Sequence, residues 1–102
     1  MLTSRERVMR ALNHQEADMV PLDLGGCATS GMQISSVYLL RQALGLDAPG
    51  TPVKLVEPYQ MLGEIGMDLL EAIGADVVPL ESTRTFFGYH RRDWKPWTLH
   101  DG

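Results

Sequence analysis

Apolar and polar residues alternate along two short stretches of this chain. In residues 20–26, Val20, Leu22 and Leu24 occupy every second position, a spacing typical of a strand with one apolar face. Two glycines follow, which permit a sharp turn. A second apolar run covers residues 75–80. Because helical patterns precede and separate these runs, the chain is predicted to be an alternating α/β protein with strands at 20–26 and 75–80.

A first helix is predicted from Thr3 to about His14. The spacing of Thr3 and Glu6 matches a capping box, in which the hydroxyl and the carboxylate each accept a hydrogen bond from the other residue's backbone N–H. Val8 and Leu12 are four residues apart and share one face of this helix. We expect that apolar face to pack on the domain.

Two later regions are also predicted to be helical. Ser35 or Ser36 is expected to cap a helix that Gly45 ends with a left-handed residue. Residues 58–73 keep an apolar face at helical spacing and form either one helix or two short ones, ended by Gly74. Residues 53–56 are a short extended candidate.

The carboxyl-terminal part combines aromatic and basic residues. From residue 84 onward they are interleaved as Arg84, Phe86, Phe87, Tyr89, Arg91, Arg92, Trp94, Lys95 and Trp97. This pattern is found in proteins that bind single-stranded nucleic acid, but the net charge of −4 opposes that function. We expect hairpin strands packed on the domain, with a further turn at Asp101-Gly102.

Composition restricts the class of protein further. The chain is 44% hydrophobic and 22% charged, which is typical of a folded domain. Its single cysteine excludes an internal disulfide and fits a reducing compartment, and no apolar run approaches the length of a membrane span. We therefore expect a cytoplasmic protein. The basic residues Arg5, Arg7 and Arg10 are expected to form a solvated helix face, with an anion or subunit contact as the alternative.

Candidate binding residues follow the two predicted strands, because ligands of α/β folds bind at the carboxyl ends of strands. They are Asp23, Gly25, Gly26 and Cys27 after the first strand and Glu81 after the second. Asp23 either lines a pocket or accepts N–H groups of the following loop. Cys27 is a candidate by its position, either as a nucleophile or as a small buried side chain. These residues define no catalytic mechanism, and no metal site is expected in this segment.

Several short motifs resemble one known family. They are Thr3-Ser4-Arg5-Glu6-Arg7-Val8 with Ala11-Leu12-Asn13-His14, Asp18 with Val20-Pro21-Leu22-Asp23 and Gly25-Gly26, Leu44-Gly45-Leu46, Gly74-Ala75-Asp76-Val77, and Trp94-Lys95-Pro96-Trp97. Together they resemble the amino-terminal region of the uroporphyrinogen decarboxylase superfamily. This resemblance implies that residues 1–102 are the amino-terminal portion of a (β/α)8 TIM barrel, incomplete in this chain, with its first two strands at 20–26 and 76–80.

The resemblance also implies two enzymatic activities. One branch of the superfamily decarboxylates uroporphyrinogen in heme and porphyrin biosynthesis and carries an arginine-rich loop after the first strand. Residues 25–31 contain no arginine here, and a substrate with eight carboxylates requires several cations. The resemblance therefore favours the cobalamin-dependent methyltransferases, whose zinc ligands lie in the later part of the barrel. Cobalamin and zinc are thus expected only for the complete enzyme, and this segment alone is expected to be inactive.

Three hypotheses follow. The first is part of a corrinoid-dependent methyltransferase that acts on a thiol or a methylated small molecule, with a corrinoid protein as partner. The second is the decarboxylase itself. The third is a non-catalytic truncated module that assembles through its open sheet edge and apolar surface, as in a homo-oligomer. No nucleic acid or membrane is expected as a partner.

Overall fold

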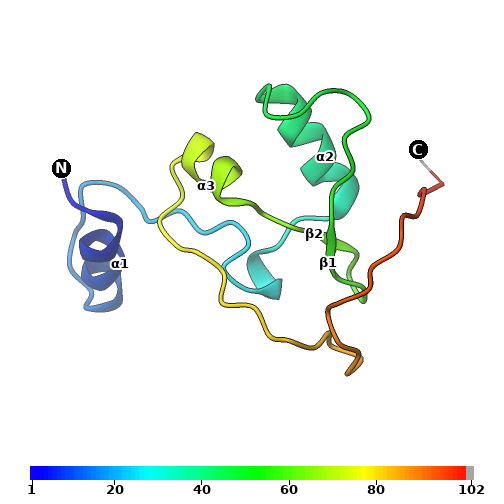
Figure 1. The fold of residues 1–102 in the computed structure, drawn as a ribbon. Coiled ribbons are helices and arrows are strands. Elements are labelled where there is room, and N and C mark those ends of the chain that lie inside the picture. Colours follow the sequence, from blue (N-terminus) through cyan, green and yellow to red (C-terminus); the bar gives the residue numbers. More distant parts are fainter. Residues whose placement is uncertain (101–102) are drawn as a thin grey trace. The chain divides into compact units, whose positions relative to one another are not determined.

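The computed structural model describes residues 1–100, which divide into two compact units. The first unit comprises residues 1–31 and 65–80, and the second comprises 32–64 and 81 onward. Figure 1 traces the elements in chain order. The predicted turn at Asp101-Gly102 lies outside the described residues.

The first unit contains helix α1 (Ser4–Leu12), the short 3-10 helix η1 (Ala28–Ser30) and helix α3 (Met67–Ile73). The capping box at Thr3 and Glu6 is confirmed, with both reciprocal hydrogen bonds present. Buried side chains of this unit include Ile65, Leu69 and Leu70. The predicted apolar face of α1 is buried only in part, since Val8 is half-buried and Leu12 is 69% exposed. Arg7 on the same helix is buried instead.

The helices end as the sequence predicts at Gly45 and Gly74, which have φ angles of 68° and 71°. Helix α1 ends in the same way without a glycine. His14 has a φ of 56°, its N–H donates to Ala11, and the N–H of Gln15 donates to Arg10. This pair of hydrogen bonds is a Schellman motif, in which glycine is the favoured left-handed residue.

We therefore expect His14→Gly to stabilise the protein, by about 0.5–1 kcal/mol relative to His14→Ala, because the left-handed backbone penalises a Cβ atom. Urea unfolding of the two variants, followed by far-UV circular dichroism, measures the difference. Equal stability of the glycine and alanine variants would contradict a left-handed residue at this position.

The second unit contains helix α2 (Ile34–Ala43) and an antiparallel pair of short strands, β1 (Leu55–Glu57) and β2 (Leu62–Gly63). Gln33 is the N-cap residue of α2, and its side chain accepts hydrogen bonds from the N–H groups of Ser35 and Ser36. The prediction that one of these serines is the cap was therefore wrong. Val37 of α2 is fully buried, as is most of Leu62.

The predicted helix over residues 58–73 forms only at Met67–Ile73. Before it, the carboxylate of Glu57 accepts from the N–H groups of Tyr59 and Gln60 and holds a turn. Gly63 then lies so close to α2 that a Cβ would stand 3.1 Å from the Ile34 Cα. These tertiary contacts outweigh the helical spacing of the apolar residues.

Neither predicted strand, 20–26 or 75–80, forms in the described structure. The backbone hydrogen bond that joins the two segments runs from the Asp76 N–H to the Leu22 carbonyl, 2.8 Å away. Pro21 has no N–H to donate, and the Leu22 N–H donates to the Asp76 carboxylate instead of a neighbouring backbone. A ladder therefore cannot extend, although the two segments lie side by side. The two-stranded sheet that does form is open, and the barrel stays a prediction.

The aromatic region forms a short hairpin turn, but its side chains do not pack on the domain as predicted, since Phe86, Tyr89 and Trp97 are 76%, 73% and 87% exposed. Arg84 and His90 make an antiparallel bridge, and the N–H of Thr85 donates to the carbonyl of Tyr89. It does not extend into strands within the described residues.

No helix of residues 1–100 combines the length and apolar character required to cross a membrane.

Candidate functional site

Four of the predicted binding residues lie together in the loop that follows Leu22. The Oδ1 atom of Asp23 accepts from the Gly26 N–H at 2.9 Å and from the Ser30 hydroxyl at 3.0 Å. The Gly25 N–H also donates to the Ser30 carbonyl, at 2.8 Å. The carboxylate of Asp23 thus organises the loop, which is the structural alternative foreseen for it. We call residues 23–31 the Asp23 loop.

Both glycines of the Asp23 loop are required by close packing. Gly25 has a φ of 80°, and a Cβ there would lie 2.6 Å from the Cγ1 of Ile65. At Gly26, a Cβ would lie 2.6 Å from the Asp23 carboxylate and 3.1 Å from Val77. The loop is therefore seated on buried Ile65 and on the segment that follows Asp76. These contacts explain the glycines without a ligand.

Cys27 is exposed, so the expectation that it is a small buried side chain was wrong. The backbone N–H groups of Ser30 and Thr29, together with their hydroxyls, lower the pKa of its thiol. Its Sγ atom lies 3.9 Å from the Ser30 Oγ. An exposed thiol with a lowered pKa reacts more readily than an ordinary one, because the thiolate is the reactive form.

Glu81, the fifth predicted binding residue, belongs to the second unit. Its carboxylate lies 3.8 Å from the Nη1 of Arg91, and its side chain is 43% exposed. A loose, exposed ion pair of this kind contributes little to stability. The structure therefore places Glu81 in a weak surface ion pair with Arg91 and does not support a binding role for it.

A largely buried polar cluster centres on Arg7, a residue that was predicted to lie on a solvated face. The guanidinium makes two hydrogen bonds to Asp18, at 2.7 and 2.9 Å, and a third to the Asp76 Oδ1, at 2.5 Å. Asp76 also accepts from the Ser4 hydroxyl and the Leu22 N–H. Side-chain exposure is 7% for Arg7 and 2% for Asp76. We call Ser4, Arg7, Asp18 and Asp76 the Arg7 cluster.

The contacts of the Arg7 cluster favour the charged forms of its arginine and its two aspartates. The hydrogen bond from Arg7 lowers the pKa of Asp18, and the N–H of Leu22 and the hydroxyl of Ser4 lower the pKa of Asp76. Hydrogen bonding to Asp18 raises the pKa of Arg7. These contacts give Asp76 a structural role. The only signal for the cluster was the presence of one arginine and two aspartates in separate motifs, and sequence spacing does not show that they meet.

We expect acid to destabilise the first unit through these carboxylates. Because the pKa values of Asp18 and Asp76 are lower in the folded chain than in the unfolded chain, their stabilisation is complete above the unfolded values, near 3.8, and is lost as the pH falls through the folded values. Urea midpoints measured from pH 7 to pH 2 should therefore fall at the acidic end. In Asp76→Asn the fall should be shallower, and an unchanged slope would contradict this assignment.

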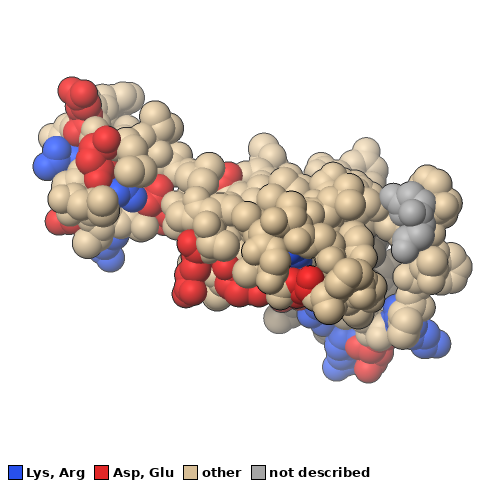
Figure 2. Space-filling view, turned by 90° about the horizontal axis from the view of Figure 1, so that it is seen from above, with Lys and Arg blue, Asp and Glu red and all other residues tan. Residues whose placement is uncertain are grey.

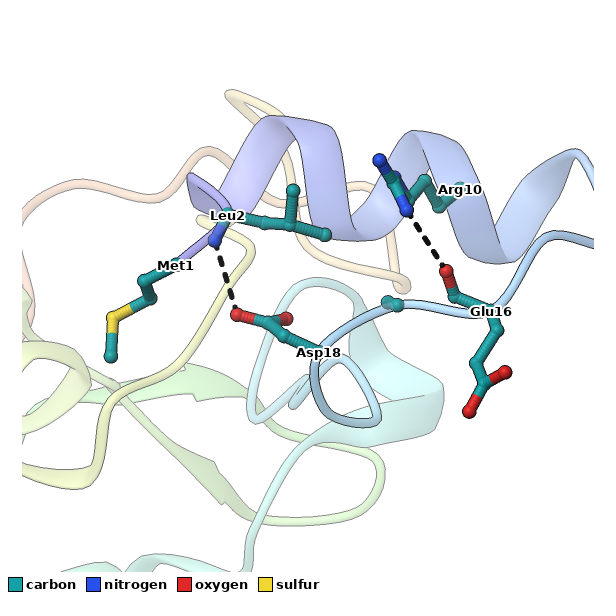
Figure 3. A pocket seen from close by; sticks show the side chains of 6 residues that line it. Met1, Leu2, Arg10, Glu16 and Asp18 are labelled. Atoms are coloured by element: carbon teal, nitrogen blue, oxygen red, sulfur yellow. Dashed lines mark hydrogen bonds between the residues drawn. The ribbon is translucent and has the colours of Figure 1, made fainter.

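A separate, open hollow lies beside α1, with a volume of about 530 Å³ (Figure 3). It is lined by Met1, Leu2, Arg10, Glu16, Ala17 and Asp18. Two of its polar contacts are internal, since the Leu2 N–H donates to Asp18 and Arg10 donates to the Glu16 carbonyl. Asp18 is moreover paired with Arg7.

The Asp23 loop carries one carboxylate, which its own hydrogen bonds engage, no basic side chain, and one exposed thiol. Among residues 1–100, no group of three or more His, Cys, Asp or Glu side chains is arranged to hold a metal ion. The described residues therefore do not fit a zinc site, and we derive no step through one. Comparison with protein-family models, with curated proteins and with solved structures found no match.

Proposed function

We propose that this chain is the amino-terminal portion of a (β/α)8 barrel enzyme of the uroporphyrinogen decarboxylase superfamily, on its corrinoid-dependent methyltransferase branch. The motifs from Thr3 to Trp97 are the basis of this proposal. In it, the Asp23 loop contributes to the pocket for a small thiol or a methylated small molecule. A corrinoid protein, zinc and a cytoplasmic location belong to the same proposal and concern the complete enzyme.

The neighbouring positions of two segments support the barrel. The first and second strands of a (β/α)8 barrel are adjacent and parallel, with a helix between them. Here the predicted strand segments are joined by the hydrogen bond from Asp76 to Leu22, and α3 directly precedes the second of them. In a barrel, further strands would cover the apolar side chains that these segments expose, among them Val20, Val78 and Leu80.

The chemistry of the Asp23 loop supports methyl transfer over decarboxylation of uroporphyrinogen, and this is the observation on which the choice rests. Residues 25–31 contain no arginine or lysine, and the nearby Arg7 is occupied by two carboxylates. A substrate with eight carboxylates would find no cation in this loop, whereas an uncharged methyl donor or a small thiol requires none.

The complete product of the native gene that encodes this chain tests the proposal. Incubation with methylcobalamin and a small thiol should consume methylcobalamin and produce the methyl thioether in equal amounts. Incubation with uroporphyrinogen should release no carbon dioxide. Decarboxylation without consumption of methylcobalamin would reverse the assignment.

A second candidate function is assembly with other copies of the chain, and one observation favours it. Tyr59, Phe86 and Phe87 contact one another, with ring centroids 5.6–6.2 Å apart, yet they remain 67%, 76% and 55% exposed. Exposed aromatic groups of this kind mark interaction surfaces. The cations of the same segment are Arg84, Arg91, Arg92 and Lys95. Figure 2 shows basic side chains (blue) in more than one place on the drawn face, with acidic side chains (red) beside them.

Self-association measures this candidate function directly. Sedimentation velocity of the chain should show concentration-dependent association that the double variant Phe86→Ser, Phe87→Ser reduces about tenfold or more, since buried aromatic residues dominate interface energies. Leu39→Ser is the matched control, because Leu39 is 65% exposed on α2 of the same unit. A monodisperse monomer at every concentration would contradict assembly, and binding of a labelled oligonucleotide at low salt would favour nucleic acid instead.

A further inference from the structure

The Arg7 cluster and the Asp23 loop are joined by a continuous path of short contacts. Asp76 is held by Arg7 on one side and exchanges two hydrogen bonds with Leu22 on the other. Leu22 directly precedes Asp23, whose carboxylate closes the loop through Gly26 and Ser30. The geometry of the loop is therefore anchored at its beginning by a buried carboxylate on a different segment.

A second contact seats the loop on the same segment. The backbone of Gly26 approaches Val77, the residue after Asp76, so closely that a Cβ would stand 3.1 Å from the Val77 Cγ2. A displacement of Asp76 would thus move both Leu22 and the surface that receives Gly26. Arg7 fixes Asp76 against such a displacement, because its guanidinium also binds Asp18 and the carbonyl of Leu2.

We propose that Arg7 is a positioning residue for the Asp23 loop, acting through Asp76 and Leu22. Its hydrogen bonds run to Asp18, Asp76 and Leu2, which lie outside the loop. The inference rests on the proposed function only in taking this loop as part of the binding site. Because Cys27 is exposed on the loop and its Sγ atom lies 3.9 Å from the Ser30 Oγ, the reactivity of Cys27 reports loop geometry without any substrate.

The experiment measures the reaction of Cys27 with a chromogenic disulfide between pH 5 and pH 10 in the full chain. Cys27 is its only cysteine, so the signal has one source. In Arg7→Met and in Asp76→Asn, the midpoint of the pH–rate profile should move upward and the rate at pH 7 should fall about twofold or more, because loss of the N–H donors reduces the thiolate fraction. Arg5→Met, on the exposed side of the same helix, should leave the profile unchanged.

The two variants separate positioning from a direct effect of charge. Loss of the Arg7 cation would by electrostatics alone raise the pKa of the thiol, whereas loss of the Asp76 anion would lower it. If Arg7 positions the loop, the midpoint of the pH–rate profile should rise in both variants. It should also rise in Arg7→Lys, because an ammonium group lacks the forked donors of a guanidinium. Ser4→Ala removes one hydrogen bond from Asp76 and is the milder substitute to measure if Arg7→Met or Asp76→Asn unfolds. Opposite movements, or unchanged profiles in folded variants, would overturn the inference.

Failure of this inference is distinguishable from failure of the proposed function. The thiol assay requires neither cobalamin nor a methyl acceptor. An unchanged pH–rate profile of Cys27 would show that Arg7 does not position the loop. It would not bear on methyl transfer, which the methylcobalamin assay tests separately. Decarboxylation by the complete enzyme would change the reaction and leave the positioning of the loop intact.

Discussion

Arg7→Met is expected to lower the melting temperature by about 10 °C or more, the largest effect of a single side chain that the structure predicts. Methionine fills a similar volume but cannot donate a hydrogen bond. Asp18 and Asp76 would then share a site without their common cation, and the side chain of Asp76 is 2% exposed. Removing one partner of a buried ion pair is costly because the other charge stays out of water.

Thermal unfolding followed by circular dichroism at pH 7 measures this effect. Arg5→Met is the control, because Arg5 is an exposed residue of the same helix, and its melting temperature should change by no more than about 2 °C. Equal melting temperatures of Arg7→Met and Arg5→Met would show that the Arg7 cluster does not stabilise the first unit.

Gly25→Ala is expected to destabilise the chain by about 2–4 kcal/mol. A residue with a side chain at a φ of 80° costs about 1–2 kcal/mol. The new methyl group would also stand 2.6 Å from the Cγ1 of buried Ile65, and overpacking of this kind costs about 1–3 kcal/mol. The two penalties act together because the backbone cannot relax one without moving the loop from Ile65.

Gly74→Ala isolates the first penalty. Gly74 belongs to the same unit and has a φ of 71°, but a Cβ there would meet nothing within 4 Å. Its substitution should cost only about 1 kcal/mol. Urea unfolding of both variants gives the difference, and equal costs would show that the Asp23 loop does not pack on Ile65.

Local signals in the sequence predicted local structure. The capping box at Thr3 and Glu6 and the left-handed ends at Gly45 and Gly74 involve residues within a few positions of one another, so the sequence contains both partners of each interaction. The hairpin after Arg84 is local for the same reason. These features depend little on the rest of the fold.

Features that depend on distant partners were missed or wrong. Apolar alternation at 20–26 predicts a strand, but the Asp76 carboxylate takes the Leu22 N–H that a ladder would need. Helical spacing after Pro58 is overridden because Gly63 packs against α2. Arg7 was assigned to solvent because arginine is usually exposed, and only the tertiary structure brings Asp18 and Asp76 to it.

The candidate site was predicted in part. The rule that ligands bind after strands selected Asp23, Gly25, Gly26 and Cys27, which the structure brings together in one loop. It also selected Glu81, which lies in the other unit. The Arg7 cluster that anchors the loop was not foreseen, since Ser4, Arg7 and Asp18 lie before the first predicted strand and Asp76 lies at the start of the second.

The central claim is that this chain belongs to a methyltransferase whose pocket includes the Asp23 loop. The most direct test follows methylcobalamin by its visible absorbance when the complete product of the native gene is mixed with a small thiol. We predict consumption of methylcobalamin matched by formation of the methyl thioether. Unchanged methylcobalamin together with release of carbon dioxide from uroporphyrinogen would contradict the claim and identify the decarboxylase.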